Sequence, residues 1–106
     1  MQTLTLAKIK KAALRYYKRG ELIAQTSRMV DSYTDGQGHR CAIGAALNVY
    51  TLQKLQRYIN DDKKPFSDFV HYNKKDGPKI NAIIAAHDDW CEGKCDEKPL
   101  LALLKS

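Results

Sequence analysis

Apolar residues recur at helical spacing in several parts of the chain, separated by glycines, prolines or polar runs. The first of these patterns predicts a helix over residues 5–19, with Thr3 or Thr5 as the N-cap and Gly20 as the C-terminal stop. Its apolar positions are Leu6, Ile9, Ala13, Tyr16 and Tyr17.

The next segment, residues 21–35, is ambiguous. Leu22, Thr26, Met29 and Tyr33 fit a helix, whereas the stretch QTSRMVDSYT suits a strand because it is rich in Thr, Val, Tyr and Ser. We favour a short helical turn followed by an irregular or strand-like stretch, and a small β-hairpin near residues 25–35 stays open as an alternative.

Residues 41–59 are again helical in pattern, but the register slips near residues 48–51, which predicts two helices with a kink between them. Residues 60–65 read as a polar loop, and residues 72–78 as a second loop. Between these loops, the pattern predicts a short helix behind Pro65 that contains Phe66, Phe69 and Val70.

The last two helical patterns complete the predicted fold. One helix is expected to begin at Pro78 and to end near Gly93, and the tail PLLALLKS is expected to form a short helix that docks on the body. The chain therefore predicts a single mainly α domain over residues 1–106, a compact bundle of about five helices. The expected inner face of the helix after Pro78 is Ile80, Ile83, Ile84, His87 and Cys91.

Charge is concentrated in the first third of the chain. The net charge is +6, and residues 1–30 hold seven basic side chains against one acidic side chain, so the remainder is neutral. Such a local excess attracts nucleic acid or an acidic protein surface. A membrane surface is disfavoured, because the first helix carries Ala and Tyr rather than Trp and Phe on its apolar side. The predicted partner-binding residues are Lys8, Lys11, Arg15, Lys18, Arg19 and Arg40.

The stretch GQGHRC raises the alternative of cysteine chemistry. Cys41 stands at a predicted helix N-terminus, where free N–H groups and the helix dipole lower the pKa of a thiol. His39 or His87 could serve as its base, with Asp88 as the orienting group. The stretch HDDW puts Asp88 and Asp89 on the solvent side, because adjacent helical residues point in different directions.

Zinc is the second chemical alternative. His39 and Cys41 form one local pair, and His87, Cys91 and Cys95 form a second group, as in sites that bring two local pairs together. No C-x2-C pair is present, and a buried free cysteine commonly acts as a small apolar residue. We therefore favour structural roles for these residues and predict no tightly bound metal and no cofactor.

The remaining sequence features narrow the class of protein. No Gly-rich phosphate loop, serine-nucleophile elbow or dinucleotide fingerprint is present in the sequence. The beginning of the chain lacks the pattern of a secretory signal, and three cysteines cannot all pair within one chain, so we expect the cytoplasm. These features favour a small non-enzymatic binding protein with a macromolecular partner.

The segments GHRCAIGAAL and AAHDDW resemble a loose group of small bacterial and phage proteins that share a G-x-x-C-A-[IL]-G-A core. This resemblance implies a helical domain from a phage or mobile element, and it transfers no catalytic residue. In this interpretation the segment is a packing device: Gly44 and its neighbouring alanines let another helix approach closely, and Cys41 is small enough to fit.

Overall fold

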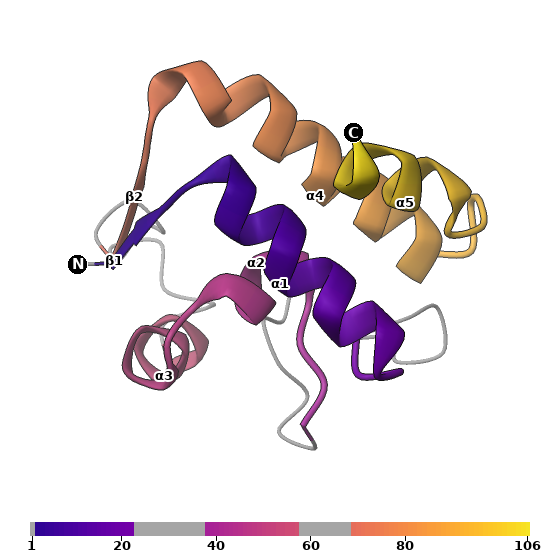
Figure 1. Cartoon of the computed structure of the whole chain (residues 1–106). Coiled ribbons are helices and arrows are strands. Elements are labelled where there is room, and N and C mark those ends of the chain that lie inside the picture. The colour runs from indigo at the N-terminus through magenta and orange to yellow at the C-terminus, as the bar shows by residue number, and fades with distance from the viewer. Residues whose placement is uncertain (1, 23–37, 58–68) are drawn as a thin grey trace.

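The computed structural model describes residues 2–22, 38–57 and 69–106, and in these ranges the protein is mainly helical (Figure 1). The prediction of a mainly α bundle of about five helices is therefore confirmed. The elements in chain order are β1 (Gln2–Leu4), α1 (Leu6–Lys18), α2 (Ala42–Ala46), α3 (Val49–Arg57), β2 (Val70–Tyr72), the 3-10 helix η2 (Lys74–Asp76), α4 (Gly77–Cys91) and α5 (Lys98–Lys105).

Helix α1 forms as the sequence predicts. The Thr5 side chain is the N-cap and accepts a hydrogen bond from the backbone N–H of Lys8 at 3.1 Å. At the other end, Gly20 has a φ of 72°, the left-handed conformation that commonly follows a helix. The inner face of α1 consists of small and branched apolar residues, of which Ile9, Ala12 and Ala13 are buried.

The predicted kink near residues 48–51 is a complete break between α2 and α3. Asn48 immediately precedes α3, and its side-chain Oδ1 accepts a hydrogen bond from the N–H of Thr51 at 2.8 Å. The Gln2 side chain holds this break in place: its Nε2 donates to the carbonyl of Ala46 at 3.0 Å, and its Oε1 accepts from the N–H of Asn48 at 2.8 Å. A residue of β1 therefore fixes the angle between the two helices.

A short parallel sheet joins the two halves of the chain. β1 pairs with β2 in the register Gln2 to Val70 and Leu4 to Tyr72. The prediction that Phe69 and Val70 belong to a helix is wrong: Val70 is a strand residue, only 2% exposed, and Phe69 precedes the strand. Val70 is β-branched, and β-branched residues favour strands over helices, especially where their side chains are buried.

The predicted loop at residues 72–78 is also wrong in part, because this stretch contains the end of β2, the helix η2 and the start of α4 at Gly77. Within α4, Ile80, Ile83, His87 and Cys91 are buried as predicted. Ile84 is the exception and is 36% exposed. The prediction of an inward Ile84 is therefore wrong, since the packed side of α4 is narrower than the apolar pattern.

The C-terminal tail forms α5 as predicted, and Leu100 and Leu104 are buried against the body. Gly93, with a φ of 77°, follows the end of α4. Figure 1 shows α1 in the middle of the molecule, between α2 on one side and α5 on the other. The buried core is Leu4, Ile9, Ala13, Leu22, Ala42, Ile43, Leu47, Leu52, Leu55, Val70, Ile80, Ile83, Leu100 and Leu104.

Some sequence predictions concern residues outside the described ranges: the alternative hairpin near residues 25–35, the polar loop at residues 60–65, and Phe66. Among the helices in the described ranges, none has the length and apolar character needed to cross a bilayer.

Candidate functional site

The exposed side of α1 is a row of cations. Five basic side chains of this helix and its C-cap are exposed, and we call them the basic face: Lys8, Lys11, Arg15, Lys18 and Arg19. At about 100° per residue they occupy an arc of about 100° around the helix, over a length of about 16 Å. The five α1 residues predicted to bind a partner therefore form one continuous surface.

The opposite side of α1 explains why this surface faces outward. Ile9 and Ala13 are completely buried, and α2 and α5 pack along the two flanks. Lys10 lies toward the α5 flank, where its Nζ donates a hydrogen bond to the carbonyl oxygen of Ser106 at 2.9 Å. Burial of one stripe of the helix thus leaves the cationic stripe in solvent.

The five cations of the basic face have no ion-pair partner in the part of the chain that the structure describes. Among residues 2–22, 38–57 and 69–106, no acidic side chain forms an ion pair with any of its five members. An ion pair elsewhere joins Lys94 Nζ to Glu92 Oε2 at 2.9 Å, beyond the end of α4. The positive charge of the basic face is therefore not compensated within this part of the protein.

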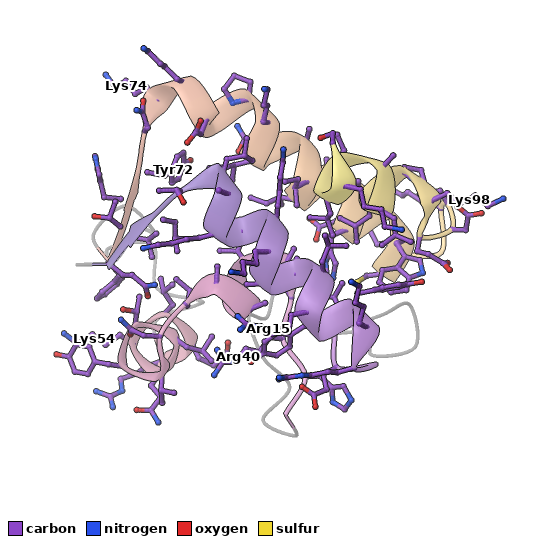
Figure 2. The ribbon with its side chains drawn as sticks, in the orientation of Figure 1. Arg15, Arg40, Lys54, Tyr72, Lys74 and Lys98 are labelled. Atoms are coloured by element: carbon purple, nitrogen blue, oxygen red, sulfur yellow. The ribbon has the colours of Figure 1, made fainter. Side chains whose placement is uncertain are left out.

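Arg40, the sixth predicted partner-binding residue, is half-buried and has protein partners (Figure 2). Its guanidinium donates hydrogen bonds to the carbonyls of Gly44 at 3.3 Å and Leu47 at 3.0 Å, and it lies 5.6 Å from the ring centroid of Tyr16. A cation at the C-terminal end of a helix satisfies free carbonyls and interacts favourably with the helix dipole. We therefore give Arg40 a structural role, holding α2 against α1.

The two tyrosines beside the basic face are half-buried and pack against the core. The Arg40 guanidinium covers Tyr16. The Tyr17 hydroxyl donates to Glu97 Oε1 at 3.3 Å, and its ring centroid lies 6.3 Å from that of Trp90. Desolvation and the Glu97 carboxylate both raise the pKa of Tyr17. Both rings therefore serve the packing of α1.

Cys41 is the N-cap of α2. Its Sγ accepts a hydrogen bond from the N–H of Gly44 at 3.2 Å, and its carbonyl accepts from the N–H of Ala45 at 2.9 Å. The residues that follow it in α2 are buried from Ala42 to Ala45 and pack against α1. The sequence correctly predicts Cys41 at a helix N-terminus, and the structure adds a capping hydrogen bond to its packing role.

The lowered pKa that the alternative of cysteine chemistry requires of Cys41 is not found. Burial raises the pKa of Cys41 to about 11, and this effect outweighs the backbone hydrogen bonds, which lower it. Burial also raises the pKa of Cys91 to about 11, and the Asp88 carboxylate raises both values further. Both thiols are therefore protonated at neutral pH, which is unfavourable for a nucleophile.

His87, which the zinc alternative groups with Cys91 and Cys95, is a core residue. His87 is 4% exposed, its ring stands edge-on to Trp90, and the Sγ of Cys91 lies 3.7 Å from its ring nitrogens. Asp88 and Asp89 are both partly buried, so the prediction of solvent-facing carboxylates is only approximate. Within the described ranges, no three His, Cys, Asp or Glu side chains are grouped so that they could hold a metal ion.

One exposed surface was not identified from the sequence. Val49 and Tyr50, at the start of α3, are 59% and 67% exposed, and Lys54 Nζ lies 4.4 Å from the centroid of the Tyr50 ring. The spacing of Tyr50 and Lys54, four residues apart on one helix, is a signal that the sequence contained. It indicates a cation–π pair on the surface rather than a core position.

Comparison of the chain with protein-family models, with curated proteins and with solved structures finds no match. The candidate site therefore depends on its own geometry and charge.

Proposed function

We propose that this chain is a small non-enzymatic binding protein that holds a polyanionic macromolecule through the basic face of α1. One observation carries the proposal: five exposed cations share one side of one helix, with no ion pair to an acidic side chain in the described ranges. Such a surface produces a local positive potential that attracts an anionic partner and speeds its association.

The scaffold supports this role. α1 is capped at Thr5, is packed on both flanks and has its inner residues Ile9 and Ala13 fully buried. The backbone positions of the cations are therefore fixed before a partner arrives, which lowers the entropy lost on binding. We extend the proposal to the cytoplasm, because all three cysteines are free thiols and thiols stay reduced there.

The test compares two double variants that remove the same charge. Lys11→Gln with Arg15→Gln removes two charges from the basic face. Lys74→Gln with Lys98→Gln removes two exposed charges elsewhere; Figure 2 shows Lys74 and Lys98 at opposite ends of the molecule, with Arg15 between them. Each variant lowers the net charge from +6 by two.

The measurement is the salt concentration that elutes each protein from immobilised heparin, a polyanion without bases. The basic-face variant should elute at clearly lower salt than the wild type, whereas the control variant should elute close to it. Urea unfolding of all three proteins verifies that they are equally stable. Equal elution of the two variants would show that only net charge matters, and the proposal would then be wrong.

A further inference from the structure

The partner of the basic face can be specified further, on condition that the proposed function holds. We infer that the partner is the phosphate backbone of double-stranded nucleic acid, contacted without reading of the bases. Four features of α1 carry this inference: the chemistry of its exposed side, the burial of its tyrosines, the packing of its flanks and the spacing of its cations.

The exposed side of α1 lacks the apolar centre that a protein partner requires. The large hydrophobic residues exposed in the described ranges are Val49, Tyr50 and Ile84, and none of them is on α1. Beside its cations, the exposed side offers only Thr5 and Ala7. Protein interfaces have an apolar core and are depleted in lysine, whereas phosphate backbones are bound by spaced Lys and Arg.

The tyrosines favour a duplex over a single strand. Proteins that bind single strands combine cations with exposed aromatic rings on which the bases stack. Here Tyr16 lies beneath the Arg40 guanidinium, and Tyr17 is held by Glu97 and Trp90. The basic face thus offers charge without a stacking surface, and this matches a duplex, whose phosphates face outward while its bases are paired inside.

The helices that pack on the two flanks of α1 prevent it from entering a groove of the duplex. A recognition helix enters the major groove, about 12 Å wide, and presents side chains to base edges. α1 is packed between α2 and α5, and its five cations lie within an arc of about 100° around the helix. Contacts to phosphate alone position a protein and carry no sequence information.

The spacing of the cations suits a backbone. Lys8 and Lys18 are about 15 Å apart along the helix axis. A duplex strand rises about 3.4 Å per phosphate, so this length passes about four phosphates of one strand. If two to four of them are contacted, the log–log slope of affinity against salt is roughly −2 to −4, at about −0.9 for each duplex phosphate.

The experiment measures fluorescence anisotropy of labelled DNA duplexes of about 20 base pairs, two helical turns, at low salt. Two duplexes of unrelated sequence and one single strand of equal length are compared. We expect the two duplexes to bind with dissociation constants within about twofold, and the single strand to bind more weakly. Lys11→Gln with Arg15→Gln should weaken duplex binding about tenfold or more and flatten the slope by about 2, whereas Lys74→Gln with Lys98→Gln should leave the slope unchanged.

Each contrary result has a distinct meaning. Retention on heparin through the basic face without duplex binding would overturn this inference and leave the proposed function intact. Tighter binding of polyglutamate than of duplex would replace nucleic acid with an acidic protein surface. Preference for the single strand, or discrimination between the two duplexes, would refute contact with phosphates alone. Absence of any polyanion binding that depends on Lys11 and Arg15 would overturn both proposals.

Discussion

The Cys41 thiol should react very slowly with an alkylating reagent in the folded protein. The thiolate attacks the methylene carbon of iodoacetamide and displaces iodide, so the rate of alkylation follows the deprotonated fraction of the thiol. With a pKa of about 11, compared with an ordinary 9.0, Cys41 is deprotonated in about one molecule in 1,000 at pH 8, against about one in 10 for an ordinary thiol. The expected slowing is therefore about 100-fold relative to the unfolded chain.

The assay is a time course of alkylation at pH 8, quenched, digested and quantified at the peptide that contains Cys41, for the folded protein and for the protein in urea. Between pH 8 and pH 10 the rate for the folded protein should rise about tenfold per pH unit. A rate equal to that of the unfolded chain would contradict the raised pKa of Cys41. A rate that is already constant between pH 8 and pH 10 would show a thiolate at neutral pH and restore Cys41 as a candidate nucleophile.

Substitution of Cys41 tests its capping role separately. Ser also offers a side-chain acceptor to the N–H of Gly44, so Cys41→Ser should retain the cap. Cys41→Ala removes the acceptor and should cost about 1 kcal/mol of unfolding free energy relative to Cys41→Ser. Neither variant should lose binding to heparin while it remains folded. Complete loss of binding in a folded Cys41→Ser protein would contradict the structural role.

Three further predictions concern stability, each measured by urea unfolding. Because burial raises the pKa of Cys41 and Cys91 to about 11, the unfolded chain releases protons that the folded protein retains between about pH 9 and pH 11. The unfolding free energy should therefore fall over this pH range, by up to about 1.4 kcal/mol per pH unit for each thiol. The fall should be smaller in a Cys41→Ser, Cys91→Ala variant. His87→Ala should cost about 1–3 kcal/mol through lost packing against Trp90 and Cys91, and a cost under about 0.5 kcal/mol would contradict that packing. Gln2→Leu should cost about 2 kcal/mol, because it removes both hydrogen bonds at the α2–α3 break, and an unchanged midpoint would contradict their contribution.

The helices could be predicted because their signals are local. Thr5 and Gly20 lie at the two ends of α1, and the apolar spacing between them fixes the buried side. The slip of register near Asn48 likewise marks the break between α2 and α3, since Asn48 caps the second helix through its own side chain. In each case the residue that sets the boundary is within a few positions of it in sequence.

The parallel sheet could not be predicted in this way. Val70 lies in a strand of three residues whose partner, Gln2–Leu4, is at the other end of the chain. A run this short has no measurable period, and pairing depends on contacts between distant residues. The prediction that Ile84 is buried was wrong for a related reason. Ile84 belongs to the apolar pattern of α4, but the neighbouring helices cover only some of the residues in that pattern.

In the candidate site, too, features set by nearby residues could be predicted and features set by distant residues could not. The exposure of Lys11 and Arg15 follows from the period of α1 alone, so the sequence identified the basic face. The burial of Tyr17 depends on Glu97 and Trp90, which come from the far end of the chain. The raised pKa of Cys41 depends on desolvation of its thiol by the surrounding fold, and the N-terminal position by itself predicts the opposite direction.

Arg15 and Arg40 show why residue type alone does not identify a binding surface. Both are arginines, and the sequence predicts the same role for both. The Nη1 of Arg40 donates to the carbonyls of Gly44 in α2 and of Leu47 at its C-cap, so this nitrogen is already used within the fold. Arg15 is exposed on a helix whose own carbonyls are satisfied along its length, and no acidic side chain of the described ranges pairs with it. Within the described ranges, an external phosphate can therefore reach Arg15 without displacing an acidic partner, whereas the Nη1 of Arg40 is already held by two carbonyls at the C-terminal end of α2.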